Sequence, residues 1–382
     1  MKSRIKLWSP VTIVLVLLFG RSLFCQTEFW EETAQPSTNQ IQALAVNPDN
    51  ILFVGTSGSG ILRSTTNGDT WTAINQGLVH SNIFRIAINS SGDIFIGTDE
   101  AKIYRSTNNG DSWTEVYSDP VRPFGVVALA INGKGNIFAD AGGIVHSPDN
   151  GESWATTDND HLAGYVWEFA FNDSDYVFAA VDRPGWLDDG VYRSKDDGEN
   201  WIRINDGLPE GPALDLALNK EGSIFVGLAG ISSQGQNTDV LYHSRDNGDS
   251  WSKVDFPWQS AIGDILINSD DNIFIAVSNH GVYRSENNGQ SWSEVNNGLP
   301  DSQISVQVFT INNLGVVFAG TWTGRVFRSQ VSTTTVEGSG NAIPKRIELA
   351  QNYPNPFNPG TTIRFRLAQT GHVTLTVFNI QG

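Results

Sequence analysis

Apolar positions in this chain come in short runs that alternate with polar residues and are separated by turn residues. The first clear unit extends from Ile41 to Asn75. Ile41–Asn47 alternates, Asn47-Pro-Asp-Asn is typical of a turn, and further runs follow at Ile51–Thr56, Gly60–Ser64 and Trp71–Asn75. A period of two indicates strands, and the turn residues mark where each strand ends. The pattern therefore predicts a unit of four short strands.

This four-strand unit recurs along the chain. The second strand carries a phenylalanine near its start, and the third strand reads ILRS, IYRS, IVHS, VYRS, LYHS, VYRS and VFRS in successive copies. Copies of one unit at a regular spacing predict a repeat architecture. The second-strand residues are Phe53, Phe95, Phe138, Phe178, Phe225, Phe274 and Phe318.

A motif of eight residues follows six of the third strands. It has Ser first, Gly fifth and Trp eighth, and successive Trp residues lie 41 to 50 positions apart. Repeats of this length, built from short strands, favour a β-propeller. The copies are Ser64–Trp71, Ser106–Trp113, Ser147–Trp154, Ser194–Trp201, Ser244–Trp251 and Ser285–Trp292.

The seventh unit lacks this motif, because its third strand ends at Ser329 and runs into Gln330 and Val331. The missing fourth strand is predicted at the other end of the chain. Phe29-Trp30-Glu31-Glu32 resembles the strand that begins at each motif Trp, and Trp30 precedes Phe53 by about the same spacing as Trp71 precedes Phe95. We therefore expect an all-β fold, a seven-bladed β-propeller over residues 27–330. Closure by the N-terminal strand removes an exposed sheet edge.

The motif resembles the Asp-box, or BNR, repeat of sialidases, sortilin-type receptors, xyloglucan-cleaving glycosidases and photosystem assembly factors. The resemblance implies a structural role. The third motif residue accepts hydrogen bonds from turn amides, Gly supplies a positive φ, and Trp packs beneath. The Arg residues of the third strands (Arg63, Arg105, Arg193 and Arg284) are in repeat frame, and His146 and His243 replace two of them, so we expect no arginine chemistry there.

Both ends of the chain have the character of export signals. Residues 1–25 have a basic start and an apolar run, Val11–Gly20, too short to span a bilayer, which is typical of a signal peptide. Cys25, the one cysteine, is a weaker candidate for lipid attachment because bulky Phe24 precedes it. Residues 331–343 are predicted to be a linker.

The tail at 344–382 closely resembles the type A sorting domain of bacterial type IX secretion. The resemblance is carried by Gln351–Pro359, Thr361–Leu367 and Val373–Asn379. It implies a partial β-sandwich sorting domain, recognised by the type IX secretion machinery, and a secreted or outer cell-surface location. Because the family continues beyond the position of Gly382, we expect a truncated tail, and periplasmic retention is the alternative if this tail fails.

Composition and the motifs that are missing exclude several classes of function. The chain has 24 Lys and Arg against 41 Asp and Glu, a formal net charge of -17, which is the opposite of a nucleic-acid-binding footprint. No phosphate-binding Gly loop, HExxH, Cys pair or GxSxG occurs. Asp173-Ser-Asp175 and Asp270-Asp271 resemble fragments of calcium loops, but Asp is also a turn former there. We therefore expect no metal and no cofactor.

Residues that break the repeat frame are the best candidates for a binding site, because the fold does not require them. Four Trp residues are out of frame, and all fall in 2–3 loops, in blade connectors or at the start of a first strand, which lie on one face of a propeller. Exposed aromatics there suit sugar stacking or a protein hot spot, although covering loop hydrophobics is the simpler role. These residues are Trp167, Trp186, Trp258 and Trp322.

A set of charged residues is predicted at the mouth of the central channel. When the first strands are aligned on their last Asn, the position four residues earlier is Arg85, Glu168, Asp215 or Asp264 in four units. Arg85 either pairs with Glu168 or Asp264, or the acids form a funnel. An insert at Val181–Gly190 adds Asp182 and Arg183 to the same face.

These patterns favour a secreted propeller that binds a glycan or a protein partner without catalysis and acts as a monomer. The alternative is a glycoside hydrolase of the sialidase or xyloglucanase type, with Asp215 and Asp264 as a carboxylate pair. No FRIP-type arginine signature of sialidases occurs, and xyloglucanases usually place their acids between two propellers. A photosystem-type assembly factor is a third hypothesis, against which the sorting-type tail argues.

Overall fold

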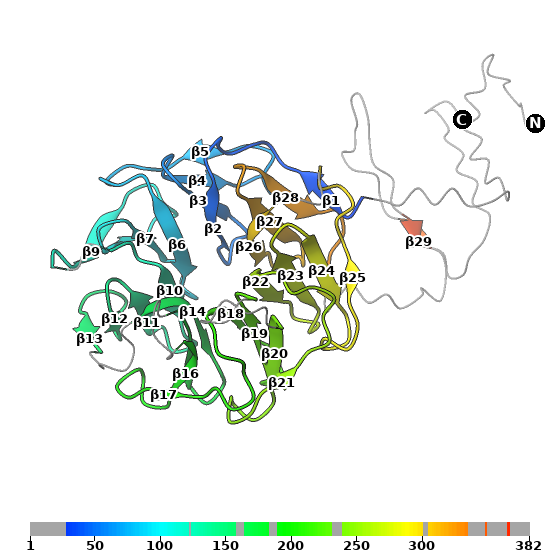
Figure 1. The fold of residues 1–382 in the computed structure, drawn as a ribbon. Coiled ribbons are helices and arrows are strands. Elements are labelled where there is room, and N and C mark those ends of the chain that lie inside the picture. The colour runs from blue at the N-terminus through cyan, green and yellow to red at the C-terminus, as the bar shows by residue number, and fades with distance from the viewer. Residues whose placement is uncertain are drawn as a thin grey trace, which may run out of the picture.

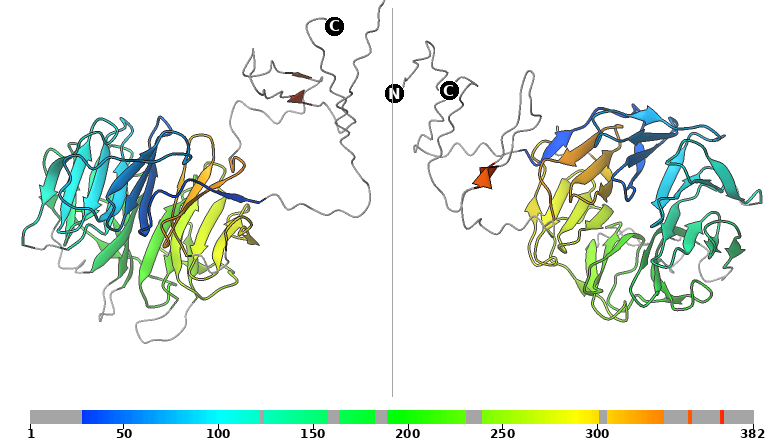
Figure 2. Two further views of the ribbon diagram at one scale, coloured as in Figure 1. Left: turned by 90° about the horizontal axis from the view of Figure 1, so that it is seen from above. Right: turned by 180° about the vertical axis from the view of Figure 1, so that it is seen from behind.

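Seven four-stranded antiparallel sheets stand around a central axis (Figure 1). The computed structural model describes residues 28–121, 124–157, 164–182, 189–230, 239–300 and 305–334, together with 348–349 and 365–366. Consecutive sheets follow one another around the ring in chain order (Figure 2). The predicted seven-bladed β-propeller is therefore confirmed.

Each blade has its first strand at the axis and its fourth at the rim. Blade 1 consists of β2 (Ile41–Val46), β3 (Leu52–Thr56), β4 (Ile61–Ser64) and β5 (Thr72–Ala73). Blade 2 consists of β6 (Ile83–Ile88), β7 (Ile94–Thr98), β8 (Lys102–Ser106) and β9 (Thr114–Ser118). Blade 3 consists of β10 (Ala128–Ile131), β11 (Ile137–Asp140), β12 (Ile144–Ser147) and β13 (Ala155–Thr156). Blade 4 consists of β14 (Tyr165–Phe171), β15 (Val177–Asp182), β16 (Gly190–Ser194) and β17 (Ile202–Arg203).

The remaining blades keep the same order. Blade 5 consists of β18 (Ala213–Leu218), β19 (Ile224–Leu228), β20 (Leu241–Ser244) and β21 (Ser252–Lys253). Blade 6 consists of β22 (Ile262–Ile267), β23 (Ile273–Val277), β24 (Gly281–Ser285) and β25 (Ser293–Glu294). Blade 7 is β26 (Val306–Ile311), β27 (Val317–Thr321), β28 (Val326–Ser329) and, from the start of the chain, β1 (Trp30–Glu32).

The core lies between neighbouring blades. Second strands such as β3 and β19 are buried along their whole length, because each is covered on both faces by adjacent blades. One cluster joins Phe53 of blade 1 to Ile83 and Ile94 of blade 2. Each blade thus buries its apolar face only when the next blade is present, as expected for repeat proteins.

The motif turns have the geometry that the sequence predicts. In the blade 5 copy, Gly248 N donates to Ser244 Oγ (2.8 Å), and Ser250 N donates to Asp246 Oδ1 (2.9 Å). Gly248 has a φ of 87°. Trp251 is buried, and its Nε1 donates to Ile204 O of blade 4 (2.6 Å). The motif therefore forms its own turn and also reaches the preceding blade.

A second set of bonds links four of the six motif turns to the turn after the first strand of the preceding blade. Asn47, at the turn after β2, accepts a hydrogen bond from Ile51 N (2.8 Å) and donates Nδ2 to Asn109 Oδ1 of blade 2 (2.9 Å). Arg63 donates to Asn109 O (2.7 Å). The Asn bridge recurs at Asn89, Asn172 and Asn219. These in-frame residues join blades.

The N-terminal strand closes the ring as predicted. β1 pairs antiparallel with β28, with Trp30 opposite Ser329 and Glu32 opposite Phe327. Trp30 is 0% exposed, and its Nε1 donates to Val295 O of blade 6 (2.7 Å).

Blade 7 replaces the missing motif with the segment after β28, which the sequence did not predict. Thr333 is buried, and its N donates to Gly315 O (2.7 Å). Asn268 of blade 6 donates Nδ2 to Thr333 O (2.7 Å), where other blades offer a motif side chain. Residues 330–334 therefore take over the bridge to blade 6.

The two faces of the ring differ in what they carry. We name the face with the loops between second and third strands, and with the blade connectors, the 2–3 face. The opposite face carries the motif turns and the turns after the first strands. Phe29 and Gln330 stand in place of the blade 7 motif turn, bonded through Gln330 N to Phe29 O (2.9 Å). The chain therefore enters and leaves the ring on the motif side.

Only two short strands of the tail are described, β29 (Glu348–Leu349) and β30 (Phe365–Arg366), which pair antiparallel. Residues 331–334, the start of the predicted linker, are described and pack on the ring through Thr333. Residues 335–343, the rest of the tail and residues 1–25 lie outside the described residues, so the remainder of the linker, the sorting domain and the signal peptide stay predictions. No helix in the described part of the chain is long and apolar enough to cross a membrane.

We expect Trp30→Ala to lower the free energy of unfolding by about 3–5 kcal/mol, because it removes a fully buried ring at the closure of the propeller. Urea unfolding followed by tryptophan fluorescence measures this. Ile202→Ala, at an exposed position in the outer strand of blade 4, is the control and should cost less than about 1 kcal/mol. Equal losses in the two variants would contradict a special role for β1.

Candidate functional site

The first strands are irregular near their beginning, at the end that lies on the 2–3 face. Six of the seven first strands have a shift in register two residues after they begin, for example between Ile83 and Arg85 in β6. A β-bulge of this kind re-aims side chains and is common beside functional sites. The extra residues are Gln42, Phe84, Trp167, Leu214, Gly263 and Gln307.

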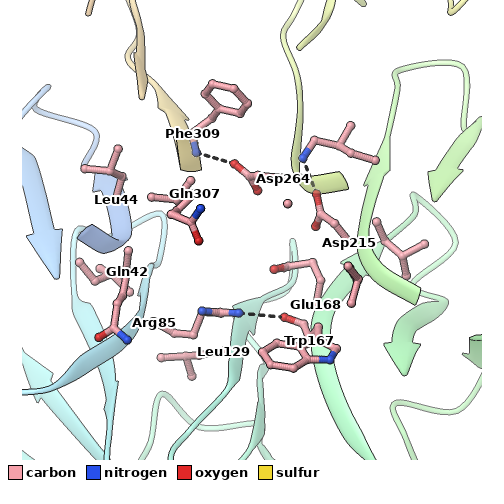
Figure 3. Close-up of a pocket in the computed structure, with 17 residues that line it drawn as sticks. Gln42, Leu44, Arg85, Leu129, Trp167, Glu168, Asp215, Asp264, Gln307 and Phe309 are labelled. Atoms are coloured by element: carbon pink, nitrogen blue, oxygen red, sulfur yellow. Dashed lines mark hydrogen bonds between the residues drawn. The ribbon is translucent and has the colours of Figure 1, made fainter. Parts of the chain in front are cut away.

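A cavity of about 260 Å³ lies at the axis beside these bulges, and we name it the axial cavity (Figure 3). Its wall includes Arg85, Glu168, Asp215 and Asp264. The structure thus brings together the four charged residues that the repeat frame selected. They come from four blades, so only the closed ring assembles them.

Arg85 does not neutralise the carboxylates by direct pairing. Its guanidinium donates to Phe84 O (2.8 Å) and to Trp167 O (3.3 Å). Among the described residues, it forms no ion pair with a carboxylate within 4.0 Å. Arg85 therefore spans blades 2 and 4 through backbone carbonyls, and pairing with Glu168 or Asp264 is not seen.

Two of the acids accept hydrogen bonds from backbone amides of the next blade. Asp215 is buried, and its carboxylate accepts a hydrogen bond from Ile265 N of blade 6. Asp264 is half-buried and in the same way accepts from Phe309 N of blade 7. These bonds satisfy amides at the inner edge of the sheets, which have no strand beside them. Glu168 has no such bond to the following blade among the described residues.

Burial makes the three carboxyls harder to ionise. It raises the pKa of Glu168 to about 8, an effect that Asp215 reinforces and Arg85 opposes. It also raises the pKa of Asp215 to about 7, against the hydrogen bond from Ile265 N. The pKa of Asp264 is raised well above its usual range, through burial and then the charge of Asp215. A carboxyl whose pKa lies near or above 7 is only partly ionised at neutral pH, and a nearby cation favours its charged form.

The out-of-frame Trp residues have different environments. Trp322 is 59% exposed in the loop between β27 and β28. Trp258 is half-buried and stacks on His280, with ring centroids 3.8 Å apart, so it packs against the blade 6 loop. Trp167 is half-buried at its bulge beside Asp182, whose pKa burial raises. Trp186 and Arg183 lie outside the described residues.

The same face has exposed apolar side chains that the sequence analysis did not select. Val79, Val121 and Phe124 are exposed in the connectors after blades 1 and 2, and Tyr165 is exposed at the start of β14. With Trp322 of blade 7 they make a set of five exposed apolar residues on the 2–3 face, which we name the apolar arc. Their sequence signal is an apolar side chain in or next to a loop that interrupts the repeat, the same signal that the out-of-frame Trp residues carry.

The two calcium-loop fragments are used in contacts between turns. Asp175 pairs with Lys134 (2.9 Å), and Asp271 accepts a hydrogen bond from Lys220 N (3.0 Å). Both have a positive φ, as in tight turns. Across the described ranges, no three His, Cys, Asp or Glu side chains are grouped to hold a metal ion.

A further buried acid lies between blades 3 and 4. Asp140 accepts hydrogen bonds from Val166 N (2.8 Å) and Gly143 N (3.2 Å). Burial nevertheless raises its pKa to about 6, and these bonds only oppose the rise. Because the folded pKa lies above the unfolded value, its contribution to stability is full below about pH 4 and is lost as pH rises through 6.

We therefore expect the Asp140 carboxyl to make the protein about 1 kcal/mol more stable at pH 5 than at pH 7. Urea unfolding of wild type and Asp140→Asn at both pH values measures the difference. Asp140→Asn should lower stability overall, because the amide nitrogen that replaces one carboxylate oxygen cannot accept the backbone N–H bonded there. The decisive quantity is the pH slope, and an unchanged slope would refute the expectation. Asp246 is no confounder, because its hydrogen bonds lower its pKa to about 2.

Solved structures with the same fold include both binders and enzymes. YCF48 bound to D1 peptide has a TM-score of 0.63 at 16% identity, covering 79% of this chain and 97% of that chain. The GH74 xyloglucanase of Xanthomonas campestris has a TM-score of 0.61 at 14% identity, over 78% of this chain and 52% of the enzyme. These likenesses show the fold alone.

PorZ of Porphyromonas gingivalis, a bacterial surface component of the type IX secretion system, has a TM-score of 0.62 at 14% identity, over 83% of this chain and 49% of PorZ. A search of curated proteins found no match. The sequence itself matches the DUF6242 beta propeller domain twice, over residues 26–166 and 167–336. Since these two matches cover most of the chain and coincide with the seven-bladed ring, the protein belongs to the DUF6242 β-propeller family.

Proposed function

We propose that this protein is a non-catalytic propeller that binds a segment of another protein on its 2–3 face, acting as a monomer. The observation that carries the proposal is the apolar arc, five exposed apolar residues on this face. Exposed apolar side chains grouped on one face are typical of protein interaction sites. Among the described residues, the motif side exposes two large apolar side chains, Leu314 (51%) and Val331 (62%), against five on the 2–3 face. The complex of YCF48 with D1 peptide supports the idea that such a ring holds a peptide.

A protein segment fits the apolar arc better than a glycan does. Val79 and Val121 offer aliphatic surface, which neither stacks on a sugar ring nor bonds hydroxyls. Trp322, Phe124 and Tyr165 add aromatic surface, which is typical of anchors in protein interfaces. The chemistry of the arc therefore favours apolar side chains as its ligand, with a glycan as the alternative outcome.

Hydrolysis is less well supported. Glycoside hydrolases need two carboxyls that flank the bond to be cleaved. Asp215 and Asp264 each accept a backbone N–H of the next blade, which gives both a structural role. The chain also spans about half of the xyloglucanase it resembles.

We also propose export through both membranes by type IX secretion, on the evidence of residues 1–25 and the tail motif. The likeness to PorZ is consistent with this setting. Fractionation of cells that produce the full chain tests it, and retention in the cytoplasm with residues 1–25 attached would refute it.

Trp322→Ala should weaken binding to an immobilised array of twelve-residue peptides by about tenfold, because it removes an exposed aromatic anchor. Leu314→Ala is the matched control, since it removes an apolar side chain of similar exposure from the same blade on the opposite face. Binding should stay unchanged in this control, and unfolding should be unaffected in both variants. A glycan array and turnover assays with xyloglucan and sialyllactose run in parallel. Glycan binding, turnover or equal effects of the two variants would overturn the proposal.

A further inference from the structure

We propose that the partner segment carries a lysine or arginine flanked by apolar residues, and that this cationic side chain enters the axial cavity while its neighbours pack on the apolar arc. The inference rests on the proposed function and specifies its ligand. It combines two independent features, the exposed apolar residues at the rim and the charge at the centre.

The charge balance of the axial cavity favours a cation. Glu168, Asp215 and Asp264 face one cation, Arg85, from three other blades (Figure 3). Arg85 directs its N–H groups to the carbonyls of Phe84 and Trp167. When ionised, the three acids carry more charge than Arg85 balances, and a low-dielectric wall strengthens their attraction for a second cation. A cation that enters the cavity opposes the effect of burial on these carboxyls and so favours their ionised form.

Hydrogen bonding in the axial cavity also suits a donor. Glu168 points into the opening and has no ion pair among the described residues (Figure 3). Gln307, at a bulge across the cavity, donates its Nε2 to Ser305 Oγ (2.5 Å), which leaves its amide oxygen as an acceptor. An ammonium or guanidinium has donors only, so it matches such a wall.

The size of the axial cavity fits a single side chain. Its volume of about 260 Å³ lies below the range of roughly 300–1,000 Å³ that drug-sized ligands occupy. The bulk of the partner must therefore lie outside, where the apolar arc is. This division predicts one inserted side chain with apolar neighbours.

The rim beside the apolar arc has the same sign. Next to Val79, His80 lies 2.8 Å from Asp99 and 3.5 Å from Glu100. Lys102 is already paired with Glu115 (2.7 Å). Acids thus outnumber the cations available to a ligand, and charge complementarity selects a basic partner over an acidic one.

The test uses the full chain and a synthetic peptide, acetyl-Gly-Leu-Phe-Lys-Phe-Leu-Gly-amide, with a second peptide in which the lysine is Nε-acetylated and neutral. We expect the lysine peptide to bind at least about tenfold more tightly, as for a hydrogen bond to a charged group. Glu168→Gln should remove most of this preference and leave the acetylated peptide unaffected. Glu221→Gln, an exposed acid at the turn after β18, is the matched control and should change neither affinity.

Wild-type protein gives a second readout without substitution. Affinity for the lysine peptide should rise from pH 6 to pH 9, because Glu168 and Asp215 lose protons in this window beside Arg85 and Asp264. Affinity for the acetylated peptide should stay level. This readout decides the question if Glu168→Gln does not fold.

The outcomes separate the two proposals. Equal binding of both peptides, with loss of both in Trp322→Ala, would overturn the cation inference and leave the proposed function standing. Preference for lysine that survives Glu168→Gln and shows no pH dependence would place the charge recognition elsewhere and overturn it too. No binding of either peptide also overturns it, and the array with Trp322→Ala then decides the proposed function alone.

Discussion

The fold depends on contacts that each motif turn makes with the blade before it. In several copies the motif Trp donates to a carbonyl of the preceding blade, as Trp113 does to Ile74 and Trp251 does to Ile204. The motif turn meanwhile receives the Asn and Arg of the preceding inner and third strands, as Asn109 does from Asn47 and Arg63. A single blade has no partner for these groups, so its turn geometry and its burial are completed only by a neighbour. Stability is therefore a property of the ring.

The same dependence explains the axial cavity. The inner strands have one edge without a neighbouring strand, and their amides need acceptors. Asp215 and Asp264 supply them across the gap between blades. Hydrogen bonds to the next blade thus fix these carboxylates in place, yet both still line the axial cavity. A position that began as a structural requirement can in this way present charge to a ligand.

Sequence reasoning reached the fold because every level of the repeat agrees. The alternation and the turn residues give seven units, the motif marks six of them, and Trp30 completes the seventh. It failed where a backbone group does the work of a side chain. The carbonyl of Thr333 replaces a motif side chain, and no residue type signals that substitution.

Part of the candidate site could be predicted from the sequence for the same reason. Positions in repeat frame share a height along the axis, so Arg85, Glu168, Asp215 and Asp264 could be grouped from the sequence. Where each hydrogen bond goes could not be deduced, because the bulges shift the backbone by one residue. The exposure of loop residues such as Val79 and the stacking of Trp258 on His280 depend on tertiary packing, which the repeat pattern does not encode.

The closing pair β1 and β28 also sets how the molecule would bear force. Trp30 begins one strand and Ser329 ends the other, and the two residues lie opposite each other. Tension between the two chain ends would peel this pair apart one hydrogen bond after another. Tension between the 2–3 face and the segment after Ser329 would instead pull β28 along its length, against β27 and β1 together. The ring should therefore resist a force applied between its 2–3 face and the segment after Ser329 better than a force that separates its two ends.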